Sequence, residues 1–79
     1  MDEIFIAFDT VANLGHEIRR LRRRAGLTQG DLAEKAGVSR RWVSYAERGH
    51  VGGEIGNLMK VVRALEVKFQ FVRPPRSSL

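Results

Sequence analysis

The segment 27–49 constrains the fold more strongly than any other part of the chain. Thr28 and Asp31 have the spacing of a capping box, which begins a helix by satisfying its first free backbone amides. This helix is expected to end near Ala36. Gly37 then supplies the left-handed backbone conformation that a tight turn needs. The segment therefore predicts a short helix followed at once by a turn.

A second short helix is expected directly after this turn. Ser39 is a favoured N-cap residue, and Gly49 is a typical residue after a helix end, so the helix should reach about Arg48. Its inward residues are expected to be Val43, Ala46 and part of Tyr45. Two short helices joined by so tight a turn must pack against each other at a fixed angle.

Two longer helices are predicted on either side of this pair. From about residue 10 to Ala25, apolar residues recur at helical spacing, and Gly26 is the expected stop. Gly15 should weaken the middle of this helix. The range 54–65 carries a second helical stripe, which we expect to be core. The residues expected to face inward on these two helices are Leu14, Ile18, Leu21, Ala25, Ile55, Leu58, Met59, Val62 and Leu65.

After Leu65 the apolar period changes from helical to alternating. Val67, Phe69 and Phe71 would face one way, as in a half-buried strand. The prolines at 74 and 75 end the pattern. The range 4–8 is short and apolar, and could be either a strand or an arm packed on the first helix.

The fold class predicted from these patterns is all-α, with four or five helices and a short C-terminal strand. The 79 residues suffice for one domain spanning 1–79. Its helical core is expected at about 10–65, the strand at about 67–73, and a frayed tail at 74–79. A single edge strand must pair or risk aggregation, so we expect this strand to pair across a homodimer through Val67, Phe69 and Phe71.

The composition favours a polyanionic partner. Fourteen Lys and Arg oppose nine Asp and Glu, which leaves a net charge of +5. The arginines at 19, 20 and 22–24 are either a phosphate-binding patch or, as is more usual, a solvated helix face. With no cysteine and two histidines outside metal-ligand spacing, no metal site or cofactor is expected. No nucleophile, base and orienting group converge, so an enzyme is not expected. No signal peptide or membrane-length segment is visible, and the expected location is the cytoplasm.

The third predicted helix has the chemistry of a DNA-reading element. Arg40 and Arg41 lie in its first turn, and arginine makes the commonest specific contact to guanine in the major groove. Ser44, one turn later, and the capping Ser39 complete the expected base-reading set. The backbone contacts are expected from residues at the start of the second helix and on the flank of the third, namely Thr28, Gln29, Trp42 and Tyr45. Trp42 could equally be a packing residue that covers the second helix.

These residues resemble a known family. The pattern formed by Gln29, Leu32-Ala33, Gly37-Val38-Ser39, Val43-Ser44 and Glu47-Arg48-Gly49 is similar to the helix-turn-helix of the Cro and phage-repressor class of regulators. With its four-helix frame, the resemblance covers about residues 14–65. Ala46 departs from the family, which more often has a larger apolar residue there, and so does the large Trp42.

Within that class, the chain most resembles HipB-like antitoxins. The helical domain is followed at once by the strand LEVKFQFV, residues 39–43 look like theirs, and an apolar arm precedes the first helix. The resemblance implies a structural ion pair between Arg22 and Glu47 and a dimer that pairs its C-terminal strands. It also implies repression of the chain's own operon from a palindromic operator in double-stranded DNA, and a HipA-like kinase toxin as a partner. The alternatives are a free-standing repressor without a toxin, and a helical module that binds protein instead of DNA.

Overall fold

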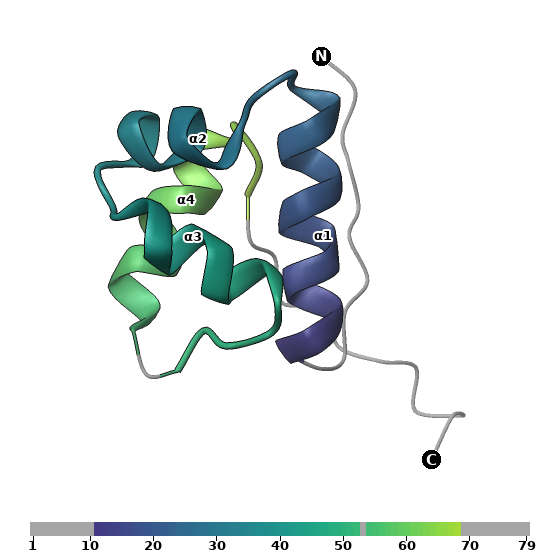
Figure 1. Ribbon diagram of the computed structural model, residues 1–79, viewed down its shortest axis with the longest axis vertical. Coiled ribbons are helices and arrows are strands. Elements are labelled where there is room, and N and C mark those ends of the chain that lie inside the picture. The colour runs from purple at the N-terminus through teal and green to yellow at the C-terminus, as the bar shows by residue number, and fades with distance from the viewer. Residues whose placement is uncertain (1–10, 53, 69–79) are drawn as a thin grey trace.

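The computed structural model describes residues 11–52 and 54–68. These residues form four helices: α1 (Val11–Arg24), α2 (Gln29–Ala36), α3 (Arg40–Glu47) and α4 (Ile55–Ala64). Each lies within one or two residues of its predicted position. In Figure 1, α1 stands along one side of the molecule, while α2, α3 and α4 cluster on the other. The all-α domain with four helices is therefore confirmed.

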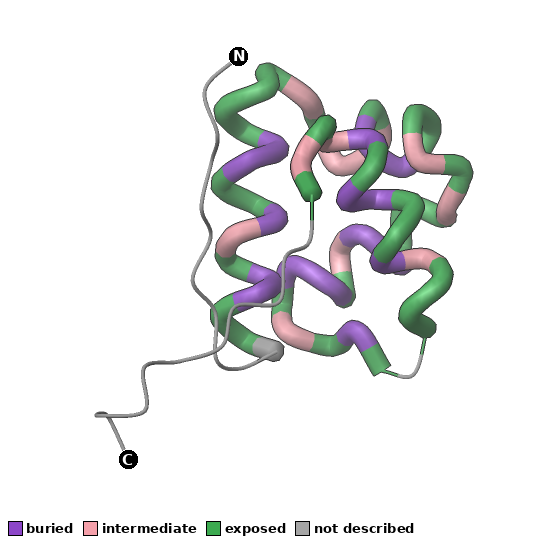
Figure 2. Tube along the Cα trace, turned by 180° about the vertical axis from the view of Figure 1, so that it is seen from behind, coloured by how far each residue is buried: buried purple, intermediate pink, exposed green. Residues whose placement is uncertain are grey.

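The hydrophobic core lies between the four helices, and each helix contributes one face to it. Helix α3 packs against both α1 and α2, and α2 also packs against α4. Figure 2 shows the buried positions on the sides of the helices that face one another. The side chains of Leu32, Val43 and Val61 are the largest that are fully buried. The core cluster also contains Leu14, Ile18, Ala33, Trp42, Ala46, Val51, Leu58, Val62 and Ala64.

The predicted core face of α4 was partly wrong. Ile55 and Met59 are 69% and 51% exposed, whereas Val61 is fully buried. The stripe drawn from the sequence was therefore misplaced around the helix, because α2 contacts the side that carries Leu58, Val61 and Val62. Helical spacing alone does not tell which edge of a wide apolar stripe meets the neighbouring helix.

Gly15 has a role that its sequence context did not reveal. It lies buried inside α1, where it faces the C-terminal end of α3. A Cβ atom built at Gly15 would lie 2.5 Å from the carbonyl oxygen of Ala46 and 2.9 Å from that of Glu47. The absence of a side chain therefore allows α1 and α3 to approach closely, and this contact helps to set the position of α3.

The predicted C-terminal strand is not seen among the residues that the structure describes. Val67 is half-buried and packs against the core, and Lys68 is exposed. Phe69, Phe71 and most of the expected range 67–73 lie outside the described residues, as do the range 4–8 and the tail 74–79. Strand pairing across a dimer therefore remains a prediction.

Candidate nucleic-acid interface

The turn between α2 and α3 is built as the sequence predicts. Thr28 Oγ1 accepts a hydrogen bond from the Asp31 amide at 3.0 Å, and the Asp31 carboxylate accepts one from the Thr28 amide at 3.0 Å. Gly37 adopts the left-handed conformation, with φ 75°, and its N–H donates to the Ala33 carbonyl. Ser39 Oγ accepts from the Trp42 amide at 3.0 Å and caps α3. Local hydrogen bonds thus determine where both helices begin and where the first one ends.

Helix α3 has a buried face and an exposed one. Trp42, Val43, Ala46 and Glu47 are buried. The opposite face carries Arg40, Arg41, Tyr45 and Arg48, which are exposed, and Ser44, which is half-buried. Because α3 is held on both α1 and α2, its outward face is presented to solvent at a defined angle. This face is rich in hydrogen-bond donors that suit base edges and phosphates.

Tyr45 lies between two arginines on this exposed face. The Arg41 guanidinium carbon is 5.2 Å from the ring centre, and that of Arg48 is 4.9 Å from it. Arg41 Nε also donates to the Tyr45 hydroxyl at 3.0 Å. The two distances from a guanidinium carbon to the ring centre are within the range of a cation–π contact. The ring therefore restricts the two guanidinium groups before any ligand binds.

Arg48 is a site residue that the sequence-based prediction missed. Its guanidinium donates to the Ser44 carbonyl and to Ser44 Oγ, both at 3.3 Å. The hydroxyl of Ser44, predicted to read bases, is thus already contacted within the protein. The positions 41, 45 and 48 follow the spacing of one helix face, and this signal could have placed Arg48 in the site.

A buried ion pair connects α1 to the end of α3. Arg22 Nε lies 2.6 Å from one carboxylate oxygen of Glu47, and a terminal guanidinium nitrogen lies 3.0 Å from the other. Arg22 also donates to the Leu27 carbonyl at 2.8 Å. The hydrogen bond to Glu47 raises the pKa of Arg22. The pair that the family resemblance implied is thus present, with both residues below 10% exposure.

Two of the residues expected to contact the DNA backbone are buried or half-buried in the protein. Trp42 is 8% exposed and belongs to the core cluster, which corrects the expected backbone contact and favours the packing interpretation of its indole. The Gln29 side chain donates to Glu47 at 3.2 Å and so completes the ion-pair network. Thr28 and Tyr45 remain exposed. Of the four expected backbone contacts, Thr28 at the N-cap of α2 and Tyr45 on α3 therefore keep exposed side chains.

The described residues contain no cluster of three or more His, Asp or Glu side chains arranged to hold a metal ion. Within the same ranges, no helix has the length and apolar character needed to cross a membrane.

A family model for the helix-turn-helix domain matches residues 13–68, which are most of the chain. The chain belongs to the helix-turn-helix family. It is a DNA-binding transcriptional regulator of the same type as the Cro and phage-repressor class, a family of regulators and not of enzymes. No curated protein sequence matches it.

Several solved helix-turn-helix structures are similar to this one. The restriction–modification controller protein C.AhdI from Aeromonas hydrophila is 33% identical over 73% of this chain and 88% of its own, with a TM-score of 0.68. A variant of the controller C.Esp1396I is 30% identical over 85% of this chain and 80% of its own, with a TM-score of 0.66. A chain of the HipA–HipB–O2–O3 complex has a TM-score of 0.81 over 90% of this chain and 100% of its own, at 21% identity. This last likeness concerns the fold alone.

Proposed function

We propose that this regulator is a repressor that binds a palindromic operator as a homodimer and reads its bases with α3. The observation that carries the proposal is the exposed face of α3, where Arg40 and Arg41 occupy the first turn after the Ser39 cap. The first residues of a recognition helix are the ones that contact base edges in this class of motif. The buried Arg22–Glu47 pair and the close approach at Gly15 connect α1 to the C-terminal end of α3, and so help to fix the position of this face.

The two arginines in the first turn differ in their freedom. Arg41 is held by Tyr45, whereas Arg40 is exposed and makes no hydrogen bond or ion pair with any described residue. Arg40 can therefore turn toward a guanine without breaking an internal contact. Arg41 would bind in an orientation that the tyrosine already favours. Each bidentate contact to a guanine contributes about 1–3 kcal/mol of discrimination.

The test is a band shift with the DNA immediately upstream of the chain's own gene. Arg40→Ala and Arg41→Ala should each weaken binding by about 1–3 kcal/mol and relax base preference at one position of each half-site. Arg63→Ala is the matched control, since it removes an exposed arginine from the last turn of α4. Full affinity and unchanged base preference in both α3 variants would show that α3 is not the reader.

The homodimer is the second part of the proposal. One recognition helix covers few base pairs, so an operator with two half-sites about one helical turn apart needs two copies of α3. We assign the pairing to the alternating residues Val67, Phe69 and Phe71. A chain that ends at Val67 should be monomeric in sedimentation and should bind the operator far more weakly. If the shortened chain still dimerised, the interface would lie on the helices, where Ile55 and Met59 are exposed.

For the biological setting, we propose that the repressor is an antitoxin that regulates its own toxin–antitoxin operon, with a HipA-like kinase as its partner. The resemblance of residues 39–43 and of the sequence LEVKFQFV to HipB-like antitoxins supports this setting, and the chain of the HipA–HipB–O2–O3 complex shares the fold. The 33% identity to C.AhdI favours a second candidate, control of a restriction–modification system. A repressor with neither partner and a protein-binding module are the further alternatives.

Expressing the neighbouring gene separates these settings. An antitoxin should rescue growth that the neighbouring product arrests, and should co-purify with that product. A controller protein should instead change transcription of an adjacent endonuclease or methyltransferase gene. Failure of any upstream DNA to shift would favour the protein-binding module.

A further inference from the structure

We propose that α1 carries a second DNA-binding surface, centred on Arg19 and Arg23, that contacts the phosphate backbone beside the stretch read by α3. His16, Arg19, Arg20 and Arg23 line a shallow depression on α1 of about 320 Å³. Their spacing of three and four residues places them along one face of the helix. These four residues form the α1 stripe.

Most of the positive charge of the α1 stripe is not neutralised within the protein. Glu17 pairs with Arg20 at 2.7 Å. Arg19 and Arg23 are exposed, and neither has a carboxylate within ion-pair distance among the described residues. Like charges four residues apart on a helix repel and destabilise it. A bound anion relieves this repulsion, so the arrangement favours an anionic ligand.

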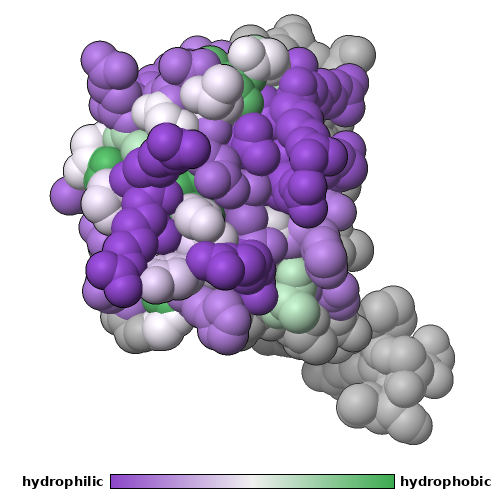
Figure 3. Space-filling model, in the orientation of Figure 1, coloured by the Kyte–Doolittle hydropathy of each residue, from purple (hydrophilic) through white to green (hydrophobic). Residues whose placement is uncertain are grey.

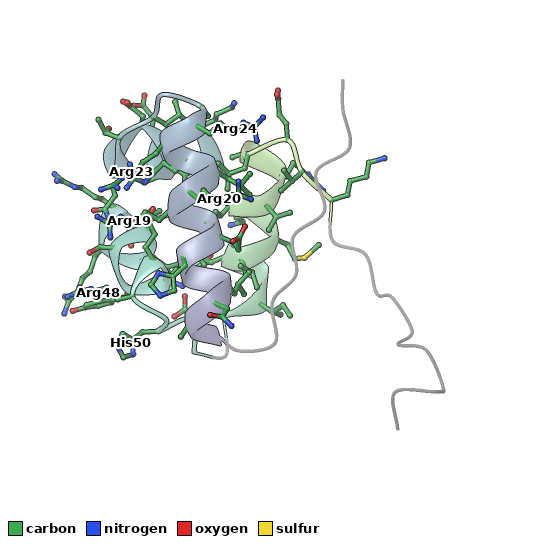
Figure 4. The ribbon with its side chains drawn as sticks, turned by 90° about the vertical axis from the view of Figure 1, so that its right-hand side faces the viewer. Arg19, Arg20, Arg23, Arg24, Arg48 and His50 are labelled. Carbon is green, nitrogen blue, oxygen red and sulfur yellow. The ribbon has the colours of Figure 1, made fainter. Side chains whose placement is uncertain are left out.

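The α1 stripe lies on the same side of the molecule as the reading face. Figure 4 shows Arg19 and Arg23 on the same side of the molecule as Arg48 and His50. This is the side that faces the viewer in Figure 3, where strongly hydrophilic side chains gather over both α1 and the α2–α3 pair. Gly49 lies against Ala12, so the start of the loop after α3 adjoins the first turn of α1. A duplex that contacts α3 can therefore extend toward α1 on the same side of the molecule.

The geometry suits a polyphosphate strand. Arg19 and Arg23 are one helical turn apart, about 6 Å along the axis, which allows each to contact a different phosphate of one strand. Phosphate contacts position a protein on DNA and carry no base information. The α1 stripe should therefore increase affinity and extend the footprint while leaving base preference unchanged.

The experiment compares the Arg19→Ala/Arg23→Ala double variant with Arg24→Ala/Arg63→Ala. The control removes the same charge from two exposed arginines in the last turns of α1 and α4. Binding of the full chain to its own upstream DNA and to a mixed-sequence 30-base-pair duplex is measured against salt. The stripe variant should lower the log–log salt slope by about 1.8 for each protomer, because two phosphate contacts at about 0.9 each are lost. The control should change the slope much less.

Two further measurements keep the result specific. The stripe variant should bind single-base variants of the operator in the same order of affinity as the unmodified chain. Arg40→Ala should change this order. The two results distinguish a failure of the α1 proposal from a failure of base reading by α3. The melting temperature of the stripe variant should equal or exceed that of the unmodified chain, because the repulsion is removed. A salt slope equal to that of the control would overturn the proposal. So would loss of binding to a co-expressed acidic protein with DNA binding intact, which would assign the stripe to a protein partner.

Discussion

Replacing Gly15 by alanine is expected to destabilise the domain, although alanine is the better helix former. Helix propensity alone predicts a gain of about 1 kcal/mol for this change inside a helix. The structure instead predicts that this change lowers the stability of the domain. The new Cβ would lie 2.5 Å from the Ala46 carbonyl oxygen, and backbone atoms cannot rotate away as a flexible side chain can. Relieving the contact requires α1 and α3 to separate.

The expected size follows from these two terms. Overpacking of a close contact costs about 1–3 kcal/mol, so the net loss of stability should be up to about 2 kcal/mol after the propensity gain. For a domain of this size, each kcal/mol lowers the melting temperature by about 4–8 °C. Operator binding should weaken as well, because the same contact sets the position of α3.

The matched control is Gly56→Ala in α4. A Cβ at Gly56 meets no atom within 4 Å, so only the propensity term acts, and the stability should rise by up to about 1 kcal/mol. Thermal and urea unfolding of both variants, followed by circular dichroism, measures the difference. If Gly15→Ala stabilised the domain as much as Gly56→Ala, the close approach of α1 and α3 would be refuted.

Two further predictions concern the charged groups. Glu47→Ala should cost about 3–5 kcal/mol in urea unfolding, because it leaves the Arg22 charge buried without its partner. Glu47→Gln keeps an oxygen that can accept from Arg22 and should cost less. Equal losses would mean that a neutral acceptor contributes nothing and that the carboxylate charge carries the whole interaction. The hydrogen bond from the Thr28 amide lowers the pKa of Asp31. The folded-state pKa is below that of the unfolded chain, so the stabilisation from this cap is present above about pH 4 and is lost as the pH falls through the lowered pKa. Asp31→Asn should therefore be less stable near neutral pH and should show a smaller loss of stability on acidification, and parallel pH profiles for both proteins would contradict this role.

The sequence by itself determined the local parts of the site. The caps at Thr28 and Ser39 and the turn at Gly37 depend on residues within four positions of one another, so their hydrogen bonds can be read from spacing. The family resemblance supplied the distant Arg22–Glu47 pair, which no local pattern contains. The exposed Arg40 and Arg41 followed from their place after the cap.

Only the tertiary structure decided which neighbours these elements meet. Helical spacing left Trp42 equally suited to packing or to DNA, and the packing of the helices placed it in the core. The same spacing put Ile55 and Met59 inside, whereas α2 covers a different side of α4. Gly15 looked like a weak point in a helix because propensity is a property of one segment. Its role depends on the end of α3, some thirty residues away in the chain. A close contact between two helices leaves no periodic signal in the sequence of either one.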